Sequence, residues 1–251
     1  MSFQDKLLDS FIAFEQVIDL DNPVHTVRKN ALKRFESDGF PTKKDELWKY
    51  TSLKSIIQKD YSLSVKSNPN VGLKDIEKYS INDIDSYKIV FVDGVFNPFL
   101  SNTTHDGMDI CVLSAALSKT KYKKTITKYF NKIVPDDQSL ASLNTSYTKE
   151  GAYIHIPKSV LPEDPVQILH FSSGKNKPLW LQPRNIIIVE ENARVEIIER
   201  HQSLRSHDGA TNSLTEIYAE KNSFIDYYKI QNDIETSNLI DNTFIDQQRD
   251  S

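Results

Sequence analysis

The sequence predicts an α+β, mainly β chain in which an N-terminal helical region precedes a right-handed parallel β-helix, a solenoid. Near the N-terminus, apolar residues recur at steps of three and four, as on one face of a helix. After about residue 152, alternating runs rich in β-branched residues replace that spacing. Three of these runs repeat at a regular interval of about 30 residues, which indicates a solenoid. We therefore expect a helical and mixed α/β region at 1–135 and the first β-helix coils at 136–251.

Two helices are predicted at the start of the chain from their apolar faces and their ends. The second begins near Asn22, where Pro23 suits the first turn of a helix. It ends at Gly39, because glycine readily adopts the left-handed conformation that follows a helix C-terminus. The expected faces are Phe3, Leu7, Phe11, Phe14 and Ile18 in the first helix, and Val24, Val27, Ala31, Leu32 and Phe35 in the second.

The segment "GFPTKKDELWKYTSL", from Gly39 to Leu53, combines lysines with aromatic residues. Thr42 and Asp45 form a loose capping box, which predicts a short helix over Lys43–Lys49. We expect the lysines to stay in solvent while Leu47, Trp48 and Tyr50 pack on the preceding helices. A nucleic-acid surface is the alternative, but few nearby lysines or aromatic residues extend this segment into a groove.

Two further elements are expected before the repeats. "YKIVFVDGVFNPFLS", from Tyr87, is typical of a β-hairpin whose turn is Asp93-Gly94. The basic run at 119–134 is interpreted as an exposed helix, with an anionic partner as the alternative. Its inward side chains are expected to be Ile126, Tyr129, Phe130 and Ile133.

The three repeats begin at Pro165, Arg194 and Phe224. Asn192 and Asn222 occupy equivalent turns before the later two, and asparagine there can adopt left-handed geometry and bond to the neighbouring coil. An antiparallel sandwich is the alternative, but the long, regular spacing of the repeats argues against it. Superposing the repeats predicts that Val166 stacks on Val195 and Ile225, Ile168 on Ile197 and Tyr227, and Leu169 on Ile198 and Tyr228.

The sequence ends within the third coil, at Ser251. A solenoid needs a cap, and an uncovered coil edge is prone to aggregate. We therefore expect the β-helix to be truncated here and the natural protein to continue.

The composition excludes several classes of protein. The chain has 31 basic and 35 acidic residues and a net charge of -4, which argues against a dedicated nucleic-acid binder. No run of about 18 apolar residues predicts a membrane helix, and the N-terminus does not resemble a signal peptide. The single cysteine, Cys111, cannot form an internal disulfide. A cytoplasmic protein is therefore expected.

No segment of the sequence matches a catalytic or metal-binding motif. The P-loop, His-Glu-x-x-His and Cys-x-x-Cys patterns are absent. We considered His201 and His207 as a metal pair but favour a loop at the end of a coil, and we interpret Cys111 as a small buried hydrophobic residue. His155 and His170 lie in alternating strands and could face either way. We accordingly assign no catalytic, cofactor-binding or metal-binding role to any residue.

Four segments together resemble the SufB/SufD family of iron–sulfur cluster assembly proteins. "GFPTKKDELWKYTSL" resembles an N-terminal signature of that family, and "IVFVDGVFNPFLS" is most like the SufD branch. "LASLNTSYTKEGAYIHIPKSVLPEDPVQI" is similar to the entry into its β-helix, and "QPRNIIIVEENARVEIIERH" to an early coil.

The resemblance implies a non-catalytic scaffold within a SufBCD-type complex. Its partners would be a SufB-like paralogous subunit, a SufC-like ABC ATPase and acceptor apo-proteins, with neither nucleic acid nor membrane. The complex would carry a transient Fe–S cluster, ATP on the partner and, in some related complexes, reduced flavin. Family members are longer than this chain, so no cofactor is assigned to it.

Two other functions remain open from the residues alone. Parallel β-helices also cleave acidic polysaccharides, which requires carboxylates that converge on a groove. Glu196, Glu199 and Asp226 are the candidates, with Glu196 and Asp226 stacked on successive coils. Alternatively, the N-terminal helices, Met1 to about Ser62, form a plain protein-interaction module.

Overall fold

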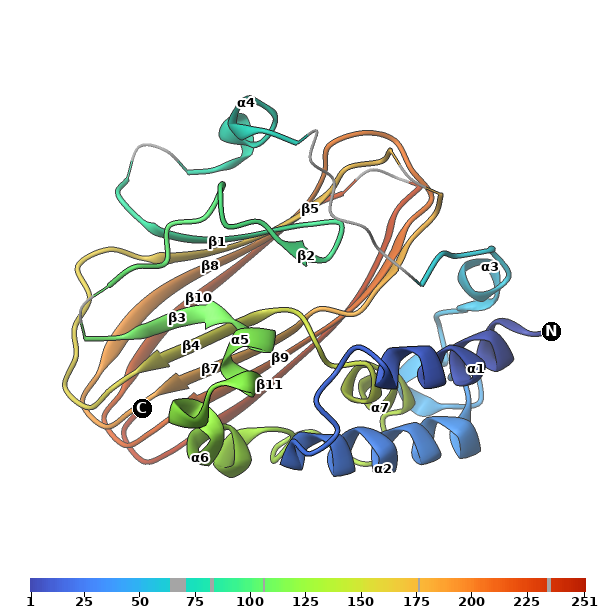
Figure 1. Ribbon diagram of the computed structural model, residues 1–251, viewed down its shortest axis with the longest axis horizontal. Coiled ribbons are helices and arrows are strands. Elements are labelled where there is room, and N and C mark those ends of the chain that lie inside the picture. The colour runs from blue at the N-terminus through green and yellow to red at the C-terminus, as the bar shows by residue number, and fades with distance from the viewer. Residues whose placement is uncertain (64–70, 82–83, 106, 176, 234–235) are drawn as a thin grey trace.

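The fold is a β-solenoid of about three turns with helices packed on its outside (Figure 1). The computed structural model describes residues 1–63, 71–81, 84–105, 107–175, 177–233 and 236–251. Two sheets form opposite walls of the solenoid, and each coil contributes strands to both of them. The predicted order of helical region and parallel β-solenoid is therefore confirmed.

The first wall has the strand order β10-β8-β5-β1-β2. The pairs β1/β5, β5/β8 and β8/β10 are parallel, whereas the edge strand β2 runs antiparallel to β1. Asp93 and Gly94 both have positive φ between β1 and β2, which is the geometry of the predicted tight hairpin. The strands are β1 (Tyr87–Val92), β2 (Val95–Phe96), β5 (Val166–Ser172), β8 (Arg194–Ser203) and β10 (Phe224–Asn232).

The second wall has the order β11-β9-β7-β4-β3, with the short strand β6 beside β9. Its pairs are parallel except at the edge, where β3 runs antiparallel to β4. Both walls therefore begin with an antiparallel edge and continue as parallel strands. The strands are β3 (Asp109–Val112), β4 (Ala152–Ile156), β6 (Trp180–Leu181), β7 (Arg184–Val189), β9 (Ala210–Ala219) and β11 (Asn238–Gln247).

The repeated asparagines behave as predicted. Asn192 and Asn222 have φ of 61° and 56°, in the left-handed region. Asn222 Nδ2 donates a hydrogen bond of 3.2 Å to Asn192 Oδ1 on the neighbouring coil. These turns hold β8 and β10 in the predicted register, in which Ile225 pairs with Val195.

The predicted register between β5 and β8 is wrong by two positions. Val166 pairs with Ile197 rather than with Val195. Ile168 and Leu169 accordingly pair with Glu199 and Arg200 rather than with Ile197 and Ile198. A shift of two positions keeps every side chain on its expected face, because side chains alternate with a period of two. The apolar pattern alone therefore does not distinguish the two registers.

Helices cover the outer faces of both walls (Figure 1). The apolar sides of α5 and α6 pack on β4, β7 and β9, and α7 lies against α2. Residues of α4 pack on the outer side chains of β1 and β5. The helices are α1 (Phe3–Glu15), α2 (Pro23–Asp38), α3 (Lys54–Ile57), α4 (Leu73–Ile76), α5 (Leu113–Ser118), α6 (Thr120–Tyr129) and α7 (Ser139–Ser146), with 3-10 turns η1 (Glu46–Trp48) and η2 (Glu77–Tyr79).

The predicted ends of α2 agree with the structure, whereas Ile18, expected on the face of the first helix, lies beyond α1, which ends at Glu15. Asn22 caps α2 by accepting a hydrogen bond from Val24 N, and Gly39 has φ of 67°. In the basic run, Ile126, Tyr129 and Phe130 are buried, and Ile133 packs partly against the same apolar cluster.

The structure corrects the prediction for the segment after Gly39. Asp45 does accept the capping bonds from Thr42, but only the short turn η1 follows it. Trp48 packs partly against the cluster between α1, α2 and α7. Leu47 and Tyr50 are 78% and 90% exposed, because one short turn cannot direct three closely spaced large side chains to the same face.

A buried ion pair joins the second wall to the helices. Arg184 of β7 and Glu216 of β9 are both fully buried, with Nη2 and Oε1 2.5 Å apart. Arg184 also donates to Thr145 Oγ1 and Asn131 Oδ1, at 2.8 and 3.1 Å. Asn131 follows α6 and Thr145 lies in α7, so one guanidinium group fixes both helices against the wall.

The backbone of Arg184 leaves no space for a side chain at residue 151. Gly151 has φ of 142°, and a Cβ atom there would lie 1.9 Å from the Arg184 carbonyl oxygen. Only glycine fits, because both the conformation and the contact exclude Cβ.

We expect Gly151→Ala to lower the free energy of unfolding by about 2 kcal/mol or more, through backbone strain and displacement of β7. Urea unfolding followed by circular dichroism measures the loss. Gly72→Ala is the matched control, because no heavy atom lies within 4 Å of its Cβ position. Equal stability of the two variants would contradict the role of Gly151.

Candidate functional site

The interior of the solenoid changes from apolar to polar along strand β8. Alternate residues of this strand face inward, and Val195 and Ile197 belong to the apolar core. Further along the same face, Glu199 and His201 are 0% and 3% exposed. Buried charged and imidazole groups require partners, so this end of the interior must contain complementary polar groups.

Two histidines stack inside the first wall. The strand register places Phe91 of β1, His170 of β5 and His201 of β8 side by side. The ring centroids of His170 and His201 are 4.6 Å apart, and those of Phe91 and His170 are 5.0 Å apart. The rings in each pair are within 16° of parallel, so the coil register itself produces the stack.

Glu199 is the central group of this site. Its Oε1 lies 2.7 Å from His201 Nε2 and 3.5 Å from Lys229 Nζ. Its Oε2 accepts hydrogen bonds from the hydroxyl groups of Tyr227 and Thr215. Burial by itself raises the pKa of Glu199, but the His201 hydrogen bond and the nearby positive charges outweigh burial and lower that pKa. Glu199 is therefore an ionised carboxylate inside the solenoid.

Lys229 and His170 lie on either side of this carboxylate. Lys229 Nζ is also 2.6 Å from Asp241 Oδ1 of the next strand, which carries the polar contacts onward to β11. Burial, followed by the proximity of His201, lowers the pKa of His170 to about 3. His170 is thus a neutral imidazole, and its Nε2 atom is buried without a hydrogen-bond partner among the described residues.

A small cavity reaches the histidine stack from the end of the strands. His170 and His201 line it together with Gln202, Thr211 and Asp233. Within the described residues, His170, Glu199 and His201 are also the one group of three histidine, cysteine or acidic side chains whose ligand atoms lie within 4.8 Å of one another. The site thus combines donors suited to a metal ion with a small adjoining cavity.

The register predicted from the repeats did not place the two stacked histidines opposite each other. In the predicted register His170 lies opposite Glu199, whereas in the observed register it lies opposite His201. The signal was present, because aligning His170 with His201 gives the correct register. His207, the other member of the considered pair, lies in the connection after β8, where its Nδ1 is 3.1 Å from the Arg205 carbonyl oxygen.

The remaining candidate residues lie elsewhere. His155 faces Asp109 and Glu190, with nitrogen–oxygen distances of 3.6 and 2.9 Å. Cys111 is half-buried rather than fully buried, and burial raises the pKa of its thiol to about 11, which keeps the thiol protonated.

The three acidic candidates do not converge. Glu196 and Asp226 stack as predicted on the exposed face, where Arg194 binds both at 3.2 and 3.0 Å. Glu199 instead points into the solenoid, so the expected carboxylate groove is not formed by these residues.

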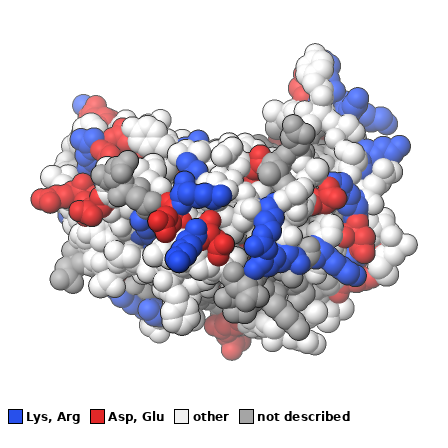
Figure 2. All heavy atoms as spheres, turned by 90° about the horizontal axis from the view of Figure 1, so that it is seen from above, with Lys and Arg blue, Asp and Glu red and all other residues white. Residues whose placement is uncertain are grey.

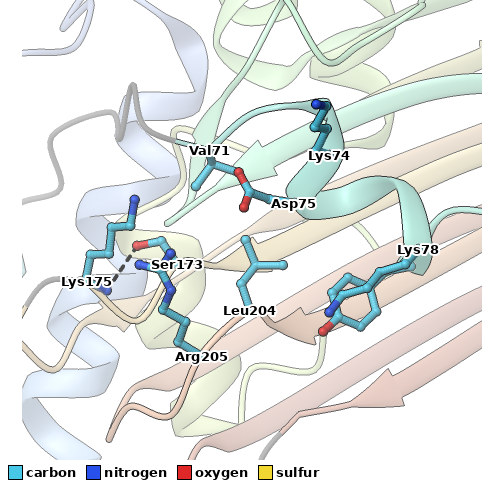
Figure 3. A pocket seen from close by; sticks show the side chains of 9 residues that line it. Val71, Lys74, Asp75, Lys78, Ser173, Lys175, Leu204 and Arg205 are labelled. Carbon is cyan, nitrogen blue, oxygen red and sulfur yellow. Dashed lines mark hydrogen bonds between the residues drawn. The ribbon is translucent and has the colours of Figure 1, made fainter.

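A second, shallower hollow lies outside the first wall. Lys74 and Lys78 approach it from α4 and η2, and Lys175 and Arg205 from the connections after β5 and β8 (Figure 3). Asp75 lies among them and accepts a hydrogen bond from Gly72 N. Viewed from this side, basic and acidic side chains are interspersed over the described surface (Figure 2). The hollow can attract small anions, but this face is not a continuous basic groove.

Acidification is expected to destabilise the fold through His170. The unfolded chain takes up this proton near pH 6.5, whereas the folded chain does so only near pH 3, with His201, Glu199 and Lys229 facing the ring. The free energy of unfolding should therefore fall as the pH decreases, by about 1.4 kcal/mol per pH unit between about pH 6 and pH 4.

The measurement is urea unfolding over a pH series, for the wild type and His170→Phe. Phenylalanine preserves the ring stack but binds no proton. The free energy of unfolding of the variant should therefore change less with pH, by about 1.4 kcal/mol per pH unit, between about pH 6 and pH 4. Identical slopes in the two proteins would show that His170 does not titrate in this way.

Two models of one protein family match consecutive parts of the chain. The family model described as "SufBD protein N-terminal region" matches residues 1–168, and that of the "SUF system FeS cluster assembly, SufBD core domain" matches residues 170–251. No described helix is both long enough and apolar enough to cross a membrane.

Similar curated proteins include an iron–sulfur cluster assembly SufBD family protein of Synechocystis sp., 25% identical over 232 residues. That match covers 89% of this chain and 51% of the relative, so the chain spans about half of its length. Bacillus subtilis SufD is 25% identical over 48% of this chain and 27% of SufD, and B. subtilis SufB is 30% identical over 40% of this chain and 21% of SufB. Because the two family models together match nearly every residue, in the order expected for a helical region and a β-solenoid, the chain belongs to the SufB/SufD family.

Proposed function

We propose that this chain is part of a non-catalytic scaffold subunit, most like SufD, of a cytoplasmic SufBCD-type complex that assembles iron–sulfur clusters and transfers them to acceptor proteins. The observation that carries the proposal is the match of both SufBD family models along the chain. A SufB-like paralogous subunit, a SufC-like ABC ATPase and acceptor apo-proteins are the proposed partners. The sequence contains no P-loop, which is consistent with ATP binding on the partner.

The geometry favours a rigid platform over a carbohydrate-active enzyme. Glycoside cleavage requires carboxylates that flank one bond in an accessible groove. Glu196 and Asp226 are both bound by Arg194 at the surface, and Glu199 is enclosed between the walls. The acids proposed for this chemistry therefore cannot act on one polysaccharide bond.

The N-terminal helices are integrated into the fold, which disfavours a separate interaction module. Arg28 of α2 is 2% exposed and donates through Nε to the Thr148 carbonyl oxygen at 2.9 Å. Leu7 and Phe35 pack in one apolar cluster with Trp180 and Ile240 of the solenoid. Removing 1–62 would uncover that cluster, so loss of binding in such a deletion would not identify a docking surface.

The proposal is tested by co-expressing the full-length protein with a SufB-like paralogue and a SufC-like ATPase from the same organism. We expect the three proteins to co-elute from a sizing column. Reconstituted with iron, sulfide and reductant, the complex should transfer a cluster to an apo-ferredoxin in an ATP-dependent manner, followed by the visible absorbance of the acceptor.

A Walker A lysine-to-alanine variant of the ATPase is the control. It should leave the complex assembled but slow transfer at least tenfold. Elution of this protein alone, in the presence of both partners, would contradict the scaffold role, and equal transfer with the ATPase variant would contradict the dependence on ATP hydrolysis.

A further inference from the structure

The three donors inside the solenoid lie close to coordination geometry. His170 comes from β5, and Glu199 and His201 from the adjacent strand β8, with their ligand atoms within 4.8 Å of one another. Ligands placed about 2.0–2.1 Å from a tetrahedral ion are about 3.4 Å apart. The three donors are therefore somewhat farther apart than in a tetrahedral site, and binding one ion requires side-chain rotation, including a turn of one of the two stacked imidazole rings.

His170 provides an independent indication of a missing partner. Its Nε2 is buried without a hydrogen bond in the described structure, and the residue is only 8% exposed. Buried polar atoms nearly always have a partner, and a neutral imidazole nitrogen is a strong metal ligand. The stacked rings require one of them to turn about its Cβ–Cγ bond, since an ion lies in the plane of each imidazole that binds it. Because Nε2 of His170 makes no hydrogen bond, turning this ring breaks none at that atom.

The surrounding residues hold the carboxylate in position for this role. Tyr227 and Thr215 bond to Oε2 of Glu199, which fixes the carboxylate plane. Oε1 is directed to His201 and, more distantly, to Lys229. Lys229 already has a closer partner in Asp241, so an ion at Oε1 would replace the His201 hydrogen bond without leaving the ammonium group unpaired. Such outer contacts orient metal ligands and increase affinity.

We propose that His170, Glu199 and His201 bind one divalent transition-metal ion, of the Fe²⁺ or Zn²⁺ class, inside the solenoid. Two imidazoles and one carboxylate suit these ions, whereas Mg²⁺ and Ca²⁺ prefer oxygen ligands alone. The small adjoining cavity is lined by Gln202, Thr211 and Asp233 as well as by Phe171, Leu181 and Pro183. This site is additional to the proposed scaffold function and does not require the partner subunits.

The test uses the chain described here, from Met1 to Ser251, freed of metal with a chelator. Titration with Co²⁺ should produce ligand-field absorption that saturates at one equivalent and is displaced by one equivalent of Zn²⁺. Fe²⁺, added under anaerobic conditions, should compete for the same site, whereas a large excess of Mg²⁺ should not. Failure to bind one equivalent of Co²⁺ or Zn²⁺, or binding of Fe²⁺ and Zn²⁺ at separate sites, would overturn the proposal.

Matched variants identify the ligands. His170→Phe keeps the ring stack and should weaken Zn²⁺ binding at least 100-fold, whereas His207→Ala, in the exposed connection, should leave it unchanged. Tyr227→Phe keeps the ring but removes the hydroxyl group that donates to Glu199, and should weaken binding about 10- to 100-fold. Circular dichroism shows whether each variant is folded. If His170→Phe is folded and binds Zn²⁺ with unchanged affinity, this site is excluded. If His170→Phe does not fold, unchanged affinity of folded Tyr227→Phe excludes the site instead.

Discussion

The register between neighbouring coils determines what the interior of this protein can contain. Each residue on a parallel strand stacks on its counterpart in the next coil, so one alignment fixes every interior pair. The observed alignment sets His170 on His201 and Ile225 on Val195. A slip of one position would turn each of these side chains to the outside. The left-handed asparagine turns hold the alignment of β8 with β10, and the polar half of the interior depends on the alignment of β5 with β8.

Two buried clusters of charged groups lie on the outside and on the inside of the solenoid and have different surroundings. Arg184 and Glu216 lie outside the second wall, where their hydrogen bonds extend to α6 and α7. Glu199 lies inside, where its bonds remain within the coils. Burying a charge costs several kcal/mol unless its partners are well placed, so both clusters require accurate packing. The outer one joins helices to strands, whereas the inner one joins one coil to the next.

Much of the fold could be predicted from the sequence because its signals are local. The Asp93-Gly94 hairpin, the Asn22 cap and the Asn192 and Asn222 turns each depend on a few adjacent residues. The register between β5 and β8 is not local, because apolar alternation is satisfied whether β5 takes the predicted alignment or the observed one. The histidine pair was missed for that reason. The exposure of Leu47 and Tyr50 was missed because a capping pattern indicates where a helix begins but not how far it continues.

The antiparallel strands at the start of both walls give the solenoid a direction. β2 and β3 run opposite to the strands they border, and β2 is very short, so neither offers the parallel edge that another coil needs. Coils can therefore accumulate only toward β10 and β11. On a ribosome, where the N-terminal part emerges first, each new coil meets a template that has already been made. The chain is thus synthesised in the same direction in which its coils stack. This reduces the number of alternative strand pairings that the folding chain has to sample before its long-range β pairs form.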